Sequence, residues 1–432
     1  MVTIIPLKVL ERIWPVTYDS RRNDGCFVIH TDQGDIVAKN NNKGMPYLDV
    51  REVEAGVALS FVQMTIGAVE AERVAPDKGV SFVQTVRGNM DGYTQREVED
   101  ARAAREAQAL VGHPTDRNFL GMVRSGMISN CPVTPTAVQN ANRIFGPDLA
   151  GVRGRTVRRP PESVTTNYVQ IPRALLERHQ RVTLAVDVMF VNGLPFLVSV
   201  ARGLNLVTAE HMPGSRTAKL LAAGIVCVMD LYSRGGFTVG TVLMDNEFEK
   251  LRNLVPVLAV NTTAAKEHVP EVERRIRLIK ERSRGILNTL PFKKMPQNML
   301  VELIYHVVLW LNAFPTKSGV SETLSPREIV MRHTLDFKKH CKAVFGSYCE
   351  THDEPAPTNT MVSRSTPAIV LGLTGNLQGT YKFFNLETEK KIKCRQFTPY
   401  PMPDTVIKKV EAFGKSSSGA FDFADRNGIL FE

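Results

Sequence analysis

The chain of 432 residues is longer than one ordinary domain and long enough for two to four. Apolar residues make up 43% of it, enough for sizeable cores, and a net charge of +10 permits a polyanionic partner without requiring one. Its six cysteines form no C-x-x-C pair, which argues against a disulfide framework or a zinc cage. With no signal-peptide pattern and no apolar run of membrane-spanning length, we expect synthesis in the cytoplasm and no membrane partner.

The first 90 residues contain short runs that are typical of strands. Residues 26–30 and 35–37 flank a turn at Asp32-Gln33-Gly34, and this pattern predicts a β-hairpin. Residues 1–90 are therefore expected to form a small β-rich region.

Three helices are predicted in the next segment, residues 91–150. A Thr94–Glu97 capping box begins the first, and Gly146-Pro147 ends the third in the way that helices commonly end. Glycine, proline and arginine then become frequent, so residues 151–178 are predicted to be a basic linker. The predicted helices cover residues 94–111, 114–126 and 135–146.

Residues 179–330 show a different rhythm, with three apolar runs separated by turns at Asn192-Gly193 and Gly203. Such runs predict an antiparallel meander of three strands. The order that follows is a helix, a strand, a helix, a strand and further helices. This order is that of a ribonuclease H-like core, a mixed five-stranded sheet with helices, although other α/β folds share it. The predicted strands cover 183–191, 195–200, 204–209, 238–244 and 258–260, and the main helices 216–232, 270–290 and 297–312.

The remaining chain is predicted to hold a second β-rich domain. Four β-like runs fall within residues 331–403, and a small SH3-like β-barrel fits them. Residues 404–432 are polar and are expected to be a flexible tail. The four runs cover 343–350, 368–373, 380–385 and 391–397.

Acidic residues occupy three positions where chemistry is plausible. Asp187 lies inside an otherwise apolar strand, where a carboxylate is costly to bury unless it is paired or metal-bound. Asp245 follows a strand end, where ligands often bind, although an aspartate there also caps helices well. Glu271 and Glu273 begin a long helix, where acids also simply suit the helix dipole. Each position alone fits a structural role, but together they supply carboxylates for two Mg²⁺ or Mn²⁺ ions in phosphoryl transfer.

Basic residues follow the acids of this long helix. Arg274, Arg275, Arg277 and Lys280 could follow a phosphate backbone. A solvated helix with charge pairs four residues apart, such as Glu273 with Arg277, is the alternative interpretation.

These motifs resemble the D,D,E pattern of retroviral and retrotransposon integrases, in the form found in copia-type elements. The matching segments are Leu184–Asp187, Asp245–Phe248 and Glu273–Ile279. The resemblance maps the catalytic, metal-binding acids onto Asp187, Asp245 and Glu273, with Glu271 as the alternate third acid. It also implies that Asn246 orients the site and that DNA is held by Arg274, Arg275, Arg277 and Lys280.

The resemblance implies a function as well. It implies 3′-end processing and strand transfer of element DNA into target DNA, in the nucleus, by a homo-oligomer. A catalytically inactive or host-adopted descendant that binds nucleic acid or serves in assembly is the alternative. A different ribonuclease H-like nuclease, such as a cut-and-paste transposase, is a third possibility that the copia-like flanking segments disfavour.

The flanking segments extend the resemblance, with two departures from the family pattern. Residues 103–114 resemble the pre-integrase segment, and residues 369–386 resemble the β-domain that follows the core. Gln108 stands where the family places a histidine, so no zinc is expected and His113 is interpreted as a structural or surface histidine. The second departure is spacing: 27 residues separate Asp245 from Glu273, fewer than in many integrases.

Overall fold

The computed structural model describes eleven segments of the chain, and every structural statement refers to them. They are residues 14–21, 25–31, 34–40, 46–47, 83–156, 168–214, 217–244, 259–262, 270–352, 361–416 and 421–422. The chain divides into two compact units, residues 1–80 and 81–432, and each is described by itself. Within the described segments, no helix is both long enough and apolar enough to cross a membrane.

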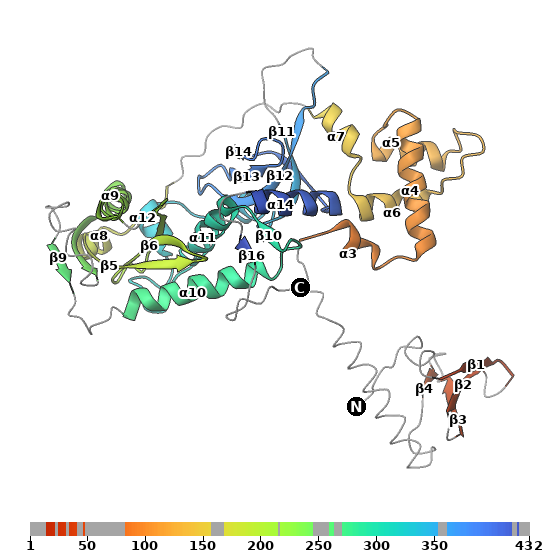
Figure 1. Ribbon diagram of the computed structural model, residues 1–432, viewed down its shortest axis with the longest axis horizontal. Coiled ribbons are helices and arrows are strands. Elements are labelled where there is room, and N and C mark those ends of the chain that lie inside the picture. Colours follow the sequence, from red (N-terminus) through yellow and green to blue (C-terminus); the bar gives the residue numbers. More distant parts are fainter. Residues whose placement is uncertain are drawn as a thin grey trace. The chain divides into compact units, whose positions relative to one another are not determined.

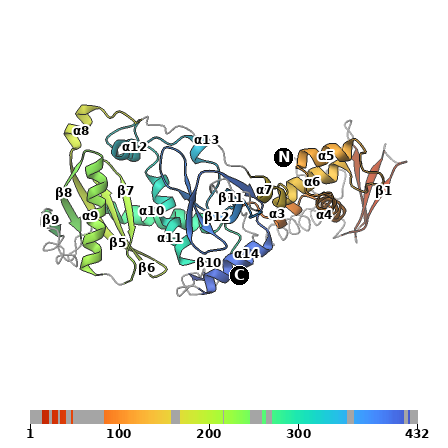
Figure 2. The ribbon, with the colours of Figure 1, turned by 90° about the horizontal axis from the view of Figure 1, so that it is seen from above.

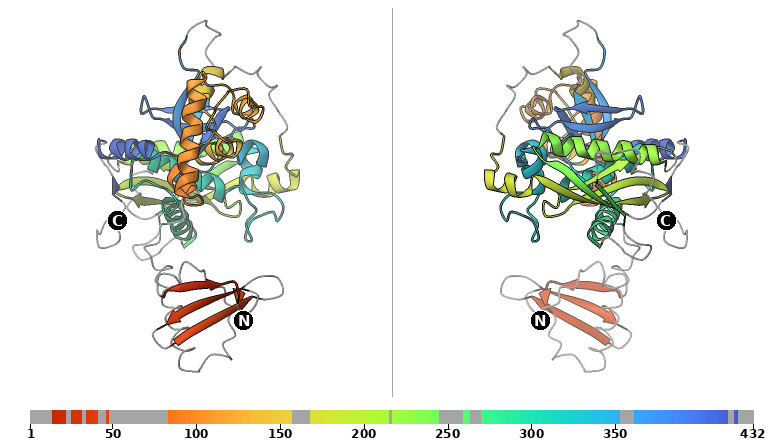
Figure 3. Two further views of the ribbon diagram at one scale, coloured as in Figure 1. Left: turned by 90° about the vertical axis from the view of Figure 1, so that its right-hand side faces the viewer. Right: turned by 90° about the vertical axis from the view of Figure 1, so that its left-hand side faces the viewer.

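Unit 1 is a four-stranded antiparallel sheet in the order β1-β2-β3-β4 (Figure 3). The predicted hairpin is confirmed, because β2 and β3 pair in a register that sets His30 opposite Asp35. The imidazole Nδ1 of His30 lies 2.8 Å from Oδ1 of Asp35 and ties the two strands together. The strands are β1 (Val16–Asp19), β2 (Cys26–Thr31), β3 (Gly34–Asn40) and β4 (Pro46–Tyr47).

Unit 2 begins with a helical module, and the three predicted helices are confirmed. At the start of α4, the Thr94 hydroxyl accepts a hydrogen bond from the Glu97 N–H while the Glu97 carboxylate accepts one from the Thr94 N–H. Ala101, Phe119 and Ile144 are fully buried where α4, α5 and α6 meet. The helices are α3 (Val86–Met90), α4 (Gln95–Leu110), α5 (Asp116–Arg124) and α6 (Pro135–Phe145).

The prediction of a linker over residues 151–178 is wrong at both of its ends. Helix α7 (Leu149–Arg155) occupies the first residues, and α8 (Arg173–His179) occupies the last. The sequence signal for α7 lies just before the glycine-rich stretch, where the Asp148 carboxylate accepts a hydrogen bond of 2.9 Å from the Gly151 N–H and caps the helix.

A five-stranded mixed sheet follows, as predicted for the core, and its strand order is β7-β6-β5-β8-β9. Figure 1 labels β5, β6 and β9 of this sheet. Strands β5, β6 and β7 pair antiparallel, whereas β8 and β9 run parallel to β5. Asn192 and Gly193 both adopt positive φ, which a two-residue hairpin requires and which these residue types tolerate. The strands are β5 (Arg181–Val191), β6 (Leu194–Ala201), β7 (Val207–His211), β8 (Thr238–Met244) and β9 (Ala259–Thr262).

Helices cover both faces of this sheet. Helix α9 (Ala218–Arg234) lies along one face of the sheet (Figure 2). Its buried side chains share a core cluster with Leu184 and Val186 of β5. The opposite face carries Ala185 and Met189 and is covered by α10 (Pro270–Leu287) and α11 (Gln297–Leu311). Successive side chains of a strand point to opposite faces of the sheet. The even-numbered residues of β5, such as Leu184 and Val186, therefore face α9, and the odd-numbered ones, such as Ala185 and Met189, face α10 and α11.

The C-terminal strands form an antiparallel sheet in the order β14-β13-β12-β11-β15. The sheet is curled, so that its edge strand β15 approaches β13. The centroid of the Phe397 ring of β15 lies 5.2 Å from that of Tyr381 and 5.1 Å from that of Phe383, both in β13. This curvature suits a barrel, and the SH3-like type stays a prediction. The elements are α12 (Pro326–Met331), α13 (Phe337–His340), β11 (Tyr348–His352), β12 (Ser365–Leu373), β13 (Tyr381–Asn385), β14 (Lys391–Cys394) and β15 (Phe397–Tyr400).

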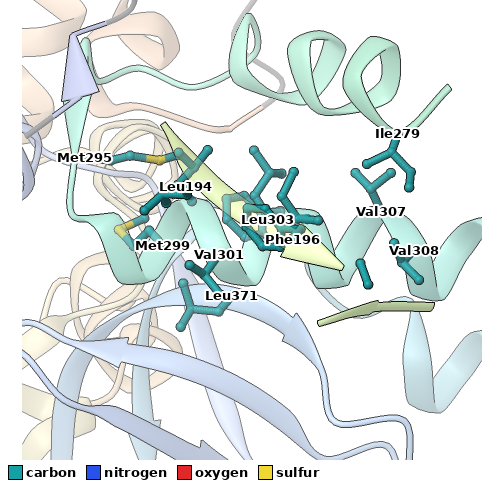
Figure 4. Packing of buried hydrophobic residues seen from close by; sticks show 14 of the residues in the cluster. Leu194, Phe196, Ile279, Met295, Met299, Val301, Leu303, Val307, Val308 and Leu371 are labelled. Atoms are coloured by element: carbon teal, nitrogen blue, oxygen red, sulfur yellow. The ribbon is translucent and has the colours of Figure 1, made fainter. Parts of the chain in front are cut away.

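The two five-stranded sheets of unit 2 share one hydrophobic core, with α11 at its centre. Figure 4 shows Leu303 and Val307 of α11 among side chains from both sides, including Phe196 of β6 and Leu371 of β12. Helix α11 was predicted to be buried because it is apolar on most sides, and nine of its residues are buried.

The prediction of a flexible tail over residues 404–432 is wrong where the structure describes it. Helix α14 (Asp404–Ser416) buries Val410 completely and packs Val406, Ile407 and Phe413 against the shared core. Beyond it, β16 (Phe421–Asp422) pairs with β10 (Lys294–Met295). The apolar residues of α14 recur at helical spacing, a signal that the polar average composition of the segment conceals.

Candidate functional site

Asp187 lies in β5, the central strand of the mixed sheet, opposite Val198 of β6. Its side chain is half-buried, and its Oδ1 accepts a hydrogen bond of 2.7 Å from the Val188 N–H. Its neighbours two positions away, Ala185 and Met189, belong to the core beneath α10 and α11. By strand alternation, Asp187 therefore lies on the sheet face that α10 covers.

Asp245 and Asn246 lie outside the described residues. Strand β8 ends at Met244, one position earlier. In the parallel register between β5 and β8, Ala185 is paired with Leu243. Asp187 and Asp245 each follow these partners by two positions in the sequence.

The first turn of α10 carries both candidates for the third acid. The Glu271 carboxylate forms a salt bridge of 2.9 Å with Nε of Arg202, and both side chains are partly exposed. Arg202 is itself fixed by its backbone N–H, which donates to the Thr183 carbonyl of β5 at 2.9 Å. Glu273 is exposed on the same turn. Glu271 thus ties the start of α10 to the sheet.

The convergence of the three acids on one metal site stays a prediction. Among the described residues, no group of three or more His, Cys, Asp and Glu side chains is arranged to hold a metal ion. Asp245 is not among those residues.

The predicted DNA-binding residues occupy different positions around α10. Arg274 and Arg277 are exposed, and Lys280 is half-buried. Arg275 is also half-buried, and burial, with a smaller effect from the neighbouring Arg282, lowers the pKa of its guanidinium. Arg275 therefore turns partly toward the protein, because it lies near Val272 on the helical wheel, whereas Arg274 and Arg277 face outward.

A polar network in the helical module was missed from the sequence. Arg105 donates hydrogen bonds to the side chains of Gln108, Asp116 and Asn142 and to the Gly146 carbonyl. Gln108 is 1% exposed and donates to Asp116 at 3.0 Å. The glutamine that stands in place of a family histidine thus joins α4 to α5. The available signal was a glutamine on the apolar face of a predicted helix.

His113 connects two helices of the module through polar contacts. Its Nδ1 lies 3.2 Å from both carboxylate oxygens of Asp148, and its carbonyl accepts a hydrogen bond of 2.5 Å from Arg155. These contacts join the end of α4 to the start and end of α7.

Two buried glutamates in the C-terminal half were also missed. Glu302 of α11 is 2% exposed and accepts hydrogen bonds of 2.9 Å from both Lys382 and Lys391. Glu350 of β11 is fully buried and forms a salt bridge of 2.8 Å with Arg153 of α7. The sequence signal in each case was a glutamate within an apolar segment.

The structure is similar to the catalytic core domain of BIV integrase, at 21% sequence identity and a TM-score of 0.26, over 34% of this chain and 93% of that one. A likeness of this size does not show the family to which the chain belongs. The sequence matches no protein-family model and no curated protein.

Proposed function

We propose that this protein is an integrase-type polynucleotidyl transferase of a copia-like retrotransposon. In this proposal Asp187, Asp245 and Glu273 bind two Mg²⁺ or Mn²⁺ ions, which activate the attacking water or 3′-hydroxyl and stabilise the leaving oxygen. The observation that carries the proposal is the place of Asp187, a half-buried carboxylate in the central strand of the mixed sheet, on the face that α10 covers.

Glu273 is the proposed third acid, and Glu271, which forms a salt bridge with Arg202, is the alternate. A carboxylate that is already paired with a guanidinium would have to lose that partner before it could bind a metal ion.

The exposed side of α10 suits the phosphate backbone of DNA. Arg274 and Arg277 are exposed, and Lys280 is within reach of solvent. Such residues would position DNA rather than read its bases. The DNA ends and the target DNA are the proposed partners, and self-association in the nucleus is part of the proposal.

The test is a strand-transfer assay with Mn²⁺ and oligonucleotides that mimic element ends. We expect Asp187→Asn and Glu273→Gln to lower the rate by about a hundredfold or more, as losing a group that stabilises transition-state charge does. Glu271→Gln is the matched control on the same helical turn. Its rate should stay within about fivefold of wild type, because partly exposed salt bridges contribute little.

Two outcomes would redirect the proposal. If Glu271→Gln abolishes strand transfer and Glu273→Gln does not, the third acid is Glu271. If the wild-type rate is no higher than that of Glu273→Gln while DNA binding persists, the protein is a non-catalytic nucleic-acid-binding descendant.

A further inference from the structure

Arg327 of α12 is a buried guanidinium without a counter-ion. It is 5% exposed, and among the described residues no carboxylate pairs with it. Its Nη2 donates to the Gly375 carbonyl, its Nη1 lies 3.3 Å from the Met331 sulfur, and its Nε has no hydrogen-bond partner in the described part of the chain. A buried charge is costly unless it is paired.

A second cationic group lies beside this guanidinium. His333 follows α12, and its imidazole lies beside the same Gly375 carbonyl, which acts to raise its pKa. Burial lowers the pKa of His333, and the charge of Arg327 lowers it further. The neutral Gly375 carbonyl therefore lies beside both the guanidinium and the imidazole. Each of these groups would bind an anion more strongly than it binds a neutral carbonyl.

An exposed aromatic ring borders the same place. The Tyr168 ring stacks on His333 with centroids 5.5 Å apart and planes 25° apart, and Tyr168 is 60% exposed. Val169 holds this segment by donating to the Arg332 carbonyl at 2.9 Å. The histidine side of the cluster thus borders solvent, whereas the guanidinium side is buried.

We propose that Arg327 and His333 form a binding site for one phosphate group, where α12 meets the turn at Gly375. The guanidinium Nε and the imidazole would donate to phosphate oxygens, and the phosphate would supply the missing negative charge. The phosphate can be free or can belong to nucleic acid, in which case Tyr168 offers a ring for a base to stack on. The nucleic-acid arm rests on the proposed function, whereas the site itself does not.

The test measures thermal unfolding of the full chain in rising inorganic phosphate, with chloride at equal ionic strength as the reference. Wild type should gain stability along a saturating curve, as binding to the native state requires. His333→Ala should weaken the apparent affinity for phosphate about tenfold or more, the loss expected for one hydrogen bond to a charged group. Arg327→Met should remove the stabilisation by phosphate. If Arg327→Met does not fold, the response of His333→Ala alone tests the proposal.

His179→Ala is the matched control, because His179 is also a partly exposed histidine in a basic stretch. General salting effects of phosphate would stabilise wild type, His333→Ala and His179→Ala alike, and that result would overturn the proposal. So would a wild-type response to phosphate that does not exceed the response to chloride.

Binding of a short duplex DNA then separates the two sources of phosphate. If His333→Ala weakens DNA binding and phosphate competes with DNA, the site takes a nucleic-acid phosphate. If DNA binding is unchanged while the phosphate effect is lost, the site takes free phosphate. Glu273→Gln should keep the phosphate effect, so failure of strand transfer and failure of this site are distinguishable.

Discussion

At the scale of single residues, His306 of α11 shows how the core selects one protonation state. Its ring lies 6.2 Å from Trp310 and 5.6 Å from Phe345, and its Nδ1 is buried without a hydrogen-bond partner among the described residues. Burial lowers the pKa of His306 to about 4. The fold therefore accommodates the neutral imidazole, and protonation would place an unpaired charge in the core.

A dependence of stability on pH follows. Between the ordinary pKa of 6.5 and the folded value of about 4, the unfolded chain binds more protons than the folded chain. The contribution of His306 is thus complete above pH 6.5 and is lost as the pH falls toward 4, by about 3 kcal/mol at most. In urea denaturation across this range, the free energy of unfolding should fall less steeply in His306→Leu than in wild type.

Some slope will remain in that variant, because burial also lowers the pKa of His211 and His333. Like His306, these histidines lower the free energy of unfolding as the pH falls. Identical slopes for the variant and wild type would show that His306 does not titrate in this way.

At the scale of elements, α14 shows that a polar segment can be part of the core. Val410 is fully buried, and the Phe413 ring lies 5.9 Å from Phe384 of β13. The Glu411 carboxylate accepts a hydrogen bond of 2.9 Å from the Lys293 N–H. These contacts attach the helix to the C-terminal sheet and to the strand that follows α10.

A charge at position 410 should therefore destabilise unit 2. We expect Val410→Asp to lower the free energy of unfolding by about 3 kcal/mol, since it buries an unpaired carboxylate. Lys408→Asp introduces the same residue at an exposed position of the same helix and should change it by about 0.5 kcal/mol or less. Similar losses in the two variants, measured by urea denaturation, would mean that α14 is not docked.

At the scale of the whole of unit 2, α11 makes two sheets into one cooperative body. It packs against β7 of the mixed sheet and β12 of the C-terminal sheet. Its buried Glu302 is held by Lys382 and Lys391, which come from the C-terminal sheet. Neither sheet can lose α11 without exposing its own core, so we expect the two to unfold together.

Glu302→Gln tests this coupling. It should lower stability by about 2 kcal/mol, less than for a fully buried pair because Lys391 is half-exposed. Two probes should shift equally: Trp310 fluorescence in a Trp14→Phe background, which leaves one tryptophan, and amide exchange in β5 and β6. A shift confined to Trp310 would show that the sheets unfold separately.

Much of the architecture was predictable because it depends on local patterns. The strands of the mixed sheet, the three module helices and the burial of α11 all follow from hydrophobic periodicity and capping residues. Asp187 was found as a candidate because a charged residue inside an apolar strand is conspicuous in sequence. Helices α7 and α14 were missed because averaged composition outweighed a capping aspartate in one and helical spacing in the other.

The sequence by itself thus determined most of the segments that become strands and helices, and where a carboxylate interrupts an apolar strand. Only the tertiary structure decided which charged groups meet. Glu271 pairs with Arg202, and Glu302 pairs with two lysines, although the partners are distant in the chain. Arg327, by contrast, has no carboxylate partner among the described residues. Such contacts depend on how elements pack, whereas secondary structure is governed largely by residues a few positions apart.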